Sequence, residues 1–268
     1  MPATDRFRST LARGPILLDA AMGTRLIARG LDLARQDPSA WVLDRPEEVL
    51  GLHRRDVAAG SEAVLTDTFG ANRAWLARYG LGARAGAINR RAAELARLAA
   101  GPDRLVLGSI GPTASDDPSA LREQAEALIE SGVDALILET HRLDQALAAL
   151  GHLVRSSDLP ILASLYRWPD PIGEAARALA GAGAGAIGAN CLPGMGPAIL
   201  VARRLRDASD LPIVIKPSPG RASPALFARA VPKLLDCGVG LIGGCCGTDD
   251  VHLLALRKAL SEPIRDRK

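Results

Sequence analysis

Three cysteines occupy positions from which their sulfur atoms could act together. The chain of 268 residues contains four cysteines, and two of them, Cys245 and Cys246, are adjacent in the segment LIGGCCGTDD. A third, Cys191, ends the segment GAGAIGANC much earlier in the chain. Thiolates of this kind suit Zn²⁺, which accepts sulfur ligands in tetrahedral geometry and can keep one position open for a substrate.

A repeated spacing predicts that these cysteines meet. Four segments begin with a glycine and continue as a short apolar strand: GSEAVLTDT, GVDALILET, GAGAIGANC and GVGLIGGCC. The position seven residues after each glycine holds, in chain order, Asp67, Glu139, Asn190 and Cys245. The position after that holds Thr68, Thr140, Cys191 and Cys246. Equal register predicts that these residues lie at one level, at the carboxyl ends of their strands.

The elements that must position these residues alternate along the chain. Apolar runs predict strands at 16–19, 63–66, 105–109, 135–139, 161–165, 186–190, 213–216 and 240–244. Amphipathic helices between them include PSALREQAEALIESG and SPALFARAVPKLLDCG, and each ends in a glycine that suits a left-handed C-cap. This order predicts an α/β fold, a (β/α)₈ TIM barrel in a single domain over residues 1–268, whose active site lies at the carboxyl ends of the strands. A doubly wound open sheet is the alternative.

Composition and charge limit the classes of protein. Hydrophobic residues make up 48% and aromatic residues 3%, which predicts a large core of Ala, Leu, Val and Ile. The net charge of +3 comes from interspersed charges without a basic block, so nothing indicates nucleic-acid binding. No apolar run approaches the ~18 residues of a membrane span, and the amino terminus lacks the apolar region of a signal peptide. We expect a cytoplasmic protein with no nucleic-acid or membrane partner, whose cysteines are ligands or nucleophiles rather than disulfides.

The residues alone leave three interpretations of the cysteines open. They could be buried apolar side chains, since free cysteine is among the most buried residue types. They could form a redox pair, although a disulfide between adjacent residues is strained. The third cysteine at matching register and the flanking glycines favour a zinc site. Cys237, in the segment LLDCG, is expected to be a packed helix residue.

Seven segments together resemble one enzyme family. ILLDAAMGT, TDTFGANR, GSIGP, LILET, GANC, IKPSPG and GGCCGT occur in this order over about residues 15–255. They resemble the homocysteine S-methyltransferase family, which includes betaine–homocysteine methyltransferase and the homocysteine-binding domain of cobalamin-dependent methionine synthase. The resemblance implies zinc-dependent methyl transfer to the thiol of homocysteine to give methionine. It also implies that Cys191, Cys245 and Cys246 bind the Zn²⁺ and that the homocysteine sulfur fills the fourth position.

The resemblance also implies residues that bind the amino-acid part of homocysteine. Asp19 and Glu139 would hold its amino group. Loops that line the same pocket supply further candidates: Asn72, Ser109 and Gly111. Structural roles are the alternatives, because Asp19 could cap a helix that begins near residue 22 and Glu139 could pair with an arginine.

Several other polar and aromatic residues have structural interpretations. Asp67 could cap a helix or form a salt bridge. Lys216 could either form an ion pair at the barrel rim or contact the substrate carboxylate. We expect the three histidines at 53, 141 and 252 to be helix-surface, helix-start or structural residues rather than ligands. Trp41 could cap the barrel mouth or anchor helix packing.

The chain departs from the family pattern around the pocket. Ala20 follows Asp19 where relatives have glycine, Asp67 replaces the asparagine of TNTFGA, and KPSPG replaces KPNAG. The stretch from Gly220 to Gly243 is shorter than in most members of the family. With few aromatic residues to surround a quaternary ammonium, betaine is disfavoured as the methyl donor. We expect a small sulfonium such as S-methylmethionine, or a methylated corrinoid protein in a separate chain. A different thiol or selenol acceptor, or a non-catalytic zinc-binding barrel subunit, are the alternatives for the function.

Overall fold

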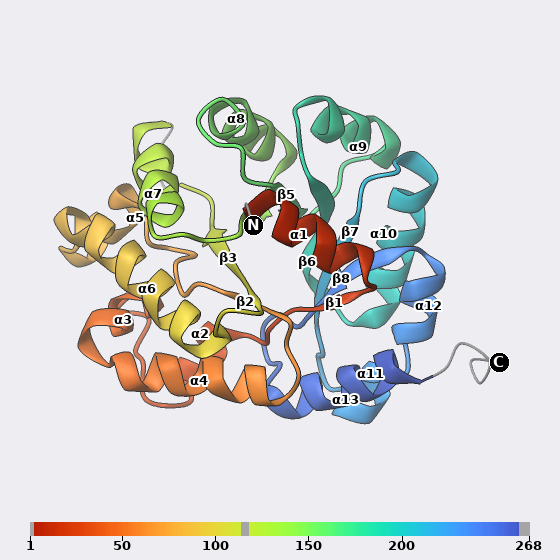
Figure 1. Cartoon of the computed structure of the whole chain (residues 1–268), viewed down its shortest axis with the longest axis horizontal. Helices are drawn as coiled ribbons and strands as arrows, with labels where there is room; N and C mark the ends of the chain where they lie inside the picture. The colour runs from red at the N-terminus through yellow and green to blue at the C-terminus, as the bar shows by residue number, and fades with distance from the viewer. Residues whose placement is uncertain (1–2, 114–117, 263–268) are drawn as a thin grey trace.

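The eight predicted strands form a nearly closed parallel barrel surrounded by helices (Figure 1). The computed structural model describes residues 3–113 and 118–262. Its strands are β1 Ile16–Leu17, β2 Ala63–Leu65, β3 Leu105–Ile110, β4 Ala135–His141, β5 Ile161–Leu165, β6 Ala186–Pro193, β7 Ile213–Ser218 and β8 Val239–Ile242. They are hydrogen-bonded in the order β1-β8-β7-β6-β5-β4-β3-β2, and every neighbouring pair in this order is parallel. The predicted (β/α)₈ barrel is confirmed.

Helices and short 3₁₀ turns connect the strands. Before β3 they are α1 Ala3–Ala12, α2 Met22–Ile27, η1 Pro38–Ala40, α3 Trp41–Asp44, α4 Pro46–Ala58, α5 Arg73–Leu76, η2 Ala77–Tyr79, η3 Gly82–Arg84 and α6 Ala85–Ala100. After β3 they are α7 Pro118–Glu130, α8 Leu143–Leu153, α9 Ile172–Gly181, α10 Met195–Ala208, α11 Pro224–Ala228, α12 Val231–Asp236 and α13 Asp250–Ser261. The glycines expected after the helices at 118–130 and 223–236 have φ of +76° and +74°, as left-handed C-caps require.

One predicted helix is divided in the structure. The segment SPALFARAVPKLLDCG folds as α11 and α12, with a break between Ala228 and Val231. Pro232 has no N–H with which to bond the carbonyl four residues earlier, at Ala228, so a continuous helix would lose that bond and meet the proline ring. In the first turn of a new helix the missing N–H costs nothing. The prediction of a single helix here was wrong for this reason.

The barrel interior is apolar towards the amino-terminal end of the strands. Leu105 and Leu107 of β3 and Ile137 of β4 belong to a buried cluster fed by all eight strands. Helix α1 packs against this cluster through Phe7 and Leu11, and Figure 1 shows it lying across the centre of the barrel. One end of the barrel is therefore filled with side chains and closed by a helix.

Polar residues occupy the next inward-facing positions. Because side chains alternate between the two faces of a strand, the residue two positions after Leu107 faces inward and is Ser109, and the one two positions after Ile137 is Glu139. The neighbouring strands contribute polar residues at their own carboxyl ends, and all are buried: Ser164, Asn190 and Lys216. This polar layer forms the floor of the functional site.

Strands β1 and β2 form the seam of the barrel. No ladder joins them among the residues that the structure describes. The backbone N–H of Glu62 donates to the carbonyl of Leu17 at 2.7 Å, and the backbone N–H of Leu65 donates to the Asp19 carboxylate at 2.7 Å. A side chain thus replaces part of the missing ladder, which also explains why both strands are shorter than predicted.

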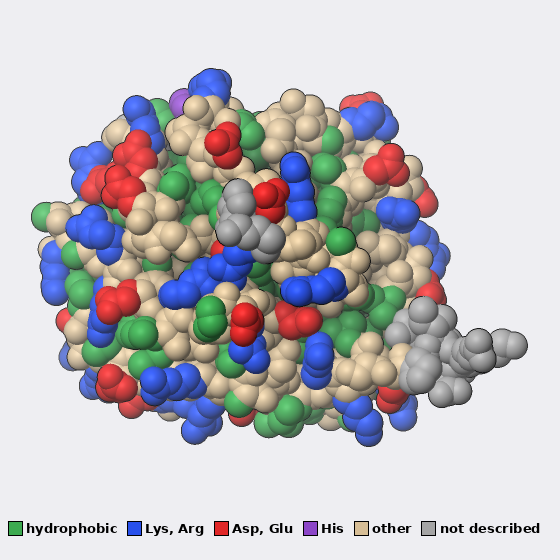
Figure 2. All heavy atoms as spheres, viewed as in Figure 1, with side chains coloured by type: hydrophobic (Ala, Val, Ile, Leu, Met, Phe, Trp, Pro, Cys, Tyr) green, Lys and Arg blue, Asp and Glu red, His purple; other side chains and the backbone are tan. Residues whose placement is uncertain are grey.

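The surface around the amino-terminal end is of mixed charge. Figure 2 shows basic and acidic side chains interspersed over this face, with apolar side chains between them. Within the described ranges, none of the helices has both the length and the apolar character needed to cross a membrane.

Candidate metal centre and substrate pocket

The sulfur atoms of Cys191, Cys245 and Cys246 come together at the carboxyl end of the barrel. All three Sγ atoms lie within 4.8 Å of one another, and those of Cys191 and Cys245 are 3.0 Å apart. With a Zn–S bond of about 2.3 Å, two sulfur ligands of a tetrahedral ion lie about 3.8 Å apart. The cluster has the donor type that such an ion needs, and an ion bound between Cys191 and Cys245 would move their sulfurs apart by about 0.8 Å. The predicted meeting of the cysteines is confirmed.

A backbone irregularity turns Cys191 towards the other two cysteines. Its φ is +57°, in the left-handed region that residues other than glycine rarely adopt. The pairing of β6 with β7 shifts register between Asn190 and Leu192, on either side of this residue. The bulge re-aims the side chain, which is a common use of bulges near active sites.

The segment that carries Cys245 and Cys246 is tied to two strands. The N–H of Cys245 donates to the carbonyl of Pro217 at 2.9 Å, and the N–H of Gly244 donates to the carbonyl of Asp19 at 3.0 Å. A Cβ atom at Gly244 would lie 2.2 Å from the hydroxyl of Thr248. Glycine is therefore required at this position for the turn to close.

A second bulge lies on β4, and Asn190 links it to the first. Thr140 has a φ of +63°. Its N–H donates to Asn190 Oδ1 at 2.9 Å, and its hydroxyl accepts a hydrogen bond from Asn190 Nδ2 at 2.7 Å. The same Asn190 oxygen accepts a hydrogen bond from Ser164 at 2.9 Å. The residue before Cys191 is thereby fixed by three hydrogen bonds, so the sulfur of Cys191 starts from a rigid backbone.

The three thiols divide their charge unevenly. Hydrogen bonds from Cys191 and Cys245 lower the pKa of Cys246 to about 3, whereas hydrogen bonds to Cys245 and Cys246 raise the pKa of Cys191. Without a cation, one thiolate is stabilised at the expense of another. A divalent ion would stabilise all three in the ionised form, because only the thiolate is a metal ligand.

The cysteines open into a pocket of about 290 Å³ whose other walls carry three carboxylates, those of Asp19, Asp67 and Glu139, and a lysine. Lys216 Nζ lies 2.8 Å from Glu139 Oε1 and 3.9 Å from Asp19 Oδ1. The Ser109 hydroxyl donates to Glu139 Oε2 at 2.8 Å. Burial alone would lower the pKa of Lys216, but Glu139 and Asp19 outweigh it and hold that pKa above its usual value, so the lysine stays charged.

Asp19 has one occupied and one vacant oxygen. Its Oδ2 accepts the hydrogen bond from Leu65, whereas its buried Oδ1 has no hydrogen-bond partner among the described residues. Burial raises the pKa of Asp19 to about 7, although Lys216 acts in the opposite direction. Helix α2 begins at Met22, but its N-cap is Ala21 and no side chain caps it. The alternative that Asp19 caps this helix was wrong.

The family of the chain follows from its sequence. The family model described as homocysteine S-methyltransferase matches residues 16–260. The chain belongs to the homocysteine S-methyltransferase family.

Several members of this family are similar over almost the whole chain. The methionine synthase of Mycobacterium tuberculosis is 29% identical over 93% of this chain, and the homocysteine S-methyltransferase of Escherichia coli strain K12 is 29% identical over 90%. The chain spans 25% of the length of the first and 94% of the second. The metallated form of the Escherichia coli homocysteine methyltransferase MmuM superimposes with a TM-score of 0.84 and 28% identity, covering 94% of this chain and 99% of that one.

Two of the predicted substrate-binding residues lie outside the pocket lining. The Asn72 side chain caps α5 by accepting a hydrogen bond from the N–H of Trp75 at 2.8 Å. The N–H of Gly111 donates to the carbonyl of Phe69 at 2.9 Å, and a Cβ atom there would lie 2.5 Å from that oxygen. Both support the loop whose Phe69 lines the pocket. A direct contact of either residue with substrate stays a prediction from the family resemblance.

The histidines divide between the interior and a helix cap. His53 on α4 and His141 at the end of β4 are buried rather than on helix surfaces, so that prediction was wrong. Burial lowers the pKa of His53 to about 3 and that of His141 to about 4. His252 pairs with Asp249 in the capping box of α13, the structural role expected for it. Helix periodicity alone did not show that the face of α4 bearing His53 is covered.

Two further residues have packing roles. Trp41 is 2% exposed in the cluster around α3, α4 and α6, and the Arg45 guanidinium lies 4.4 Å from its ring centre. It anchors helix packing rather than capping the barrel mouth. Cys237 is buried in the main core cluster, as expected. Glu139 pairs with Lys216 rather than with an arginine.

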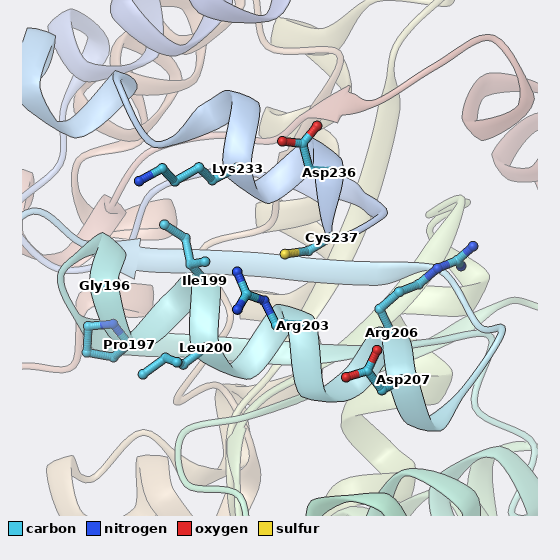
Figure 3. A pocket seen from close by; sticks show the side chains of 10 residues that line it. All are labelled: Gly196, Pro197, Ile199, Leu200, Arg203, Arg206, Asp207, Lys233, Asp236 and Cys237. Carbon is cyan, nitrogen blue, oxygen red and sulfur yellow. The ribbon is translucent and has the colours of Figure 1, made fainter. Parts of the chain in front are cut away.

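A larger hollow lies on the outside of the barrel, away from the cysteine cluster. It has a volume of about 760 Å³ between α10 and α12. Figure 3 shows Lys233 and Asp236 on one side of it and Leu200 and Arg203 on the other. It contains none of the three clustered cysteines and none of the buried carboxylates described above. The smaller pocket, which contains the three cysteines, is therefore the candidate functional site.

Proposed function

We propose that this chain is a zinc-dependent S-methyltransferase that moves a methyl group to the thiol of homocysteine and so forms methionine. The observation that carries the proposal is the meeting of three cysteine sulfurs and a Lys216–carboxylate cluster in one pocket. The first set can hold a metal that activates a thiol. The second can recognise an amino acid.

The cysteine cluster fits zinc by the chemistry of its donors. Three thiolates favour Zn²⁺ over hard cations such as Mg²⁺ and Ca²⁺, which prefer oxygen ligands. Bound by Cys191, Cys245 and Cys246, zinc would keep the acceptor thiol ionised at neutral pH, where a free thiol with a pKa of about 8.5 is mostly protonated. The Escherichia coli neighbour described in a metallated form supports the expectation that this chain also binds a metal.

The polar floor of the pocket is suited to an ammonium group. Two carboxylates, Asp19 and Glu139, surround one ammonium, that of Lys216, and so leave one negative charge uncompensated when both are ionised. The unoccupied Oδ1 of Asp19 offers an acceptor in the same place. The amino group of homocysteine would restore the balance and orient the thiol, which is a gain in positioning rather than in chemistry.

The size and lining of the pocket favour a small methyl donor. A volume of about 290 Å³ is at the lower end of the range of about 300–1,000 Å³ for ligand sites. Phe69 is the one aromatic residue in its lining among the described residues, which is too few for an aromatic cage around betaine. We favour a sulfonium such as S-methylmethionine. A methylated corrinoid protein supplied as a separate chain is the second candidate.

Three clustered free thiols need a reducing compartment to stay available to a metal. We therefore place the protein in the cytoplasm.

The proposal is tested by zinc quantification followed by methyl-transfer assays. The purified protein is expected to hold one zinc per chain and to form methionine from homocysteine with S-methylmethionine, in preference to betaine. Turnover of another thiol or a selenol at a higher kcat/KM would reassign the acceptor. Bound zinc without turnover for any donor, including a methylated corrinoid protein, would indicate a non-catalytic zinc barrel.

A further inference from the structure

Asp67 is a buried acid in the pocket that the proposed chemistry does not use. It follows β2, is 7% exposed and lines the same cavity as the three cysteines. Its Oδ2 is buried without a hydrogen-bond partner among the described residues. Buried polar groups are nearly always hydrogen-bonded, and an unpaired one costs free energy. A carboxyl group in this position therefore needs an account.

The two charged groups that act on Asp67, Asp37 and Arg25, have partners of their own. Asp37 accepts hydrogen bonds from Ser39 and from the Trp75 indole. Asp56 binds the Arg25 guanidinium through two contacts, at 2.7 and 2.6 Å. Arg25, the cation that acts on Asp67 electrostatically, is thus already paired.

We propose that Asp67 forms a cation subsite and receives the positively charged sulfonium of the methyl donor. This inference rests on the proposed methyl transfer and adds a recognition element for the second substrate. The position supports it, because Asp67 faces the cavity into which the cysteine sulfurs open. Burial and the negative charge of Asp37 raise the pKa of Asp67 to about 8, so a positive ligand beside it would also favour its ionised form. A positive ligand would supply the partner that Asp67 lacks.

The chemistry of the transfer explains what such a subsite can and cannot do. The bond between the methyl carbon and the sulfonium sulfur breaks, and its electron pair stays on the leaving sulfur, which becomes a neutral thioether. The thiolate of homocysteine supplies the pair for the new S–CH₃ bond and loses its negative charge. The positive charge on the donor is therefore greatest in the ground state. Asp67 should therefore strengthen the binding of the donor. Its removal should raise the KM for the donor with little effect on kcat.

The test compares two ligands and three proteins. S-methylmethionine and its uncharged carbon isostere, 2-amino-5-methylhexanoic acid, differ mainly in the positive charge at the branching atom. Their binding to the zinc-loaded protein would be measured by calorimetry in the wild type, in Asp67→Asn and in Asp236→Asn, which removes an exposed acid on α12. The wild type and Asp236→Asn should bind the sulfonium at least about tenfold more tightly than the isostere, and Asp67→Asn should lose that preference.

Steady-state kinetics provide the second measurement. In Asp67→Asn the KM for S-methylmethionine should rise at least about tenfold, while the KM for homocysteine and the zinc content stay unchanged. A charge preference that persists in Asp67→Asn, or a wild type that binds both ligands equally, would overturn the subsite. Because binding is measured without methyl transfer, the absence of turnover in the wild type would refute the proposed function and leave the binding result to decide the subsite.

Discussion

The two sides of the barrel mouth are built differently. On one side, β4, β5 and β6 form continuous ladders, and two bulges at Thr140 and Cys191 are cross-linked by the Asn190 side chain. On the other side, β1 and β2 share no ladder among the described residues, and the Asp19 carboxylate joins them through Leu65. Backbone pairing fixes the first side, whereas a side chain fixes the second.

This difference bears on both proposed tasks of the site. Cys191 comes from the side where backbone pairing is dense, whereas Cys245 and Cys246 follow β8, the neighbour of β1. Asp19 and Asp67, which we propose for substrate recognition, lie on the seam side, and each has a buried oxygen without a hydrogen-bond partner among the described residues. Asp19 also holds the seam, so one residue serves both stability and binding. Disturbing each side separately should therefore give distinct defects.

The largest effect is expected from removing a metal ligand. Cys246→Ala should lose bound zinc and reduce turnover on the order of a thousandfold, because the acceptor thiol would no longer be held ionised. Circular dichroism should show an intact barrel, since Cys246 is exposed. Cys237→Ala, which alters the buried cysteine outside the cluster, should keep both zinc and activity. Full activity in Cys246→Ala would remove this residue from the metal site.

The next largest effect should come from the carboxylate on β4 that we propose binds the amino group of the acceptor. Glu139→Gln removes the carboxylate that pairs with Lys216 at 2.8 Å and should raise the KM for homocysteine by about 10- to 100-fold. Zinc content should not change, because Glu139 lies on β4, whereas the cysteines lie on β6 and in the segment after β8. The KM is measured from the rate of methionine formation over a range of homocysteine concentrations. An unchanged KM would exclude Glu139 from acceptor binding.

A smaller effect should follow from loosening the bulged side. Asn190→Ala removes three hydrogen bonds, to Thr140 and Ser164, and should lower the free energy of unfolding by about 2–3 kcal/mol. It should also weaken zinc binding, because Cys191 is the next residue. Denaturant unfolding and a competitive zinc chelator measure the two effects. Ser164→Ala, which removes one of the bonds, is the matched control, and zinc affinity equal in both variants would contradict the coupling.

The smallest effect concerns pH and the seam. The pKa of Asp19 is about 7 in the folded protein against about 3.9 in an unfolded chain. Between these values the unfolded state ionises first, so this group lowers the stability of the wild type as pH rises from about 4 to 7. Asp19→Asn should lack this contribution, and its Tm relative to the wild type should rise by a few degrees between pH 5 and pH 7. A constant difference in Tm would show that Asp19 is ionised throughout.

Much of this arrangement could be predicted from the sequence, because barrel strands repeat a simple register. The count from Gly132 and Gly183 placed Glu139 and Asn190 at one level, and the structure shows both in the pocket. The same count brought Cys191, Cys245 and Cys246 to one end of the barrel, where the bulge at Cys191 turns its side chain towards the other two. Eight strands were placed because each is a short apolar run between helical segments.

Other features depend on contacts between distant segments and were not predictable. The positive φ of Thr140 and Cys191 occurs at two bulges that the Asn190 side chain links across strands, and neither residue type signals it. The absence of a ladder between β1 and β2 depends on barrel closure, which no local pattern describes. The sequence does not decide whether Lys216 forms an ion pair at the barrel rim or contacts the substrate carboxylate. Only the fold shows that it lies between Asp19 and Glu139.

The most direct test of the central claim is zinc X-ray absorption of the purified protein with and without homocysteine. The account predicts three sulfur neighbours at about 2.3 Å in the free protein and four when homocysteine is added. A sulfur count that stays at three with saturating homocysteine, or a zinc site without cysteine sulfur, would contradict it.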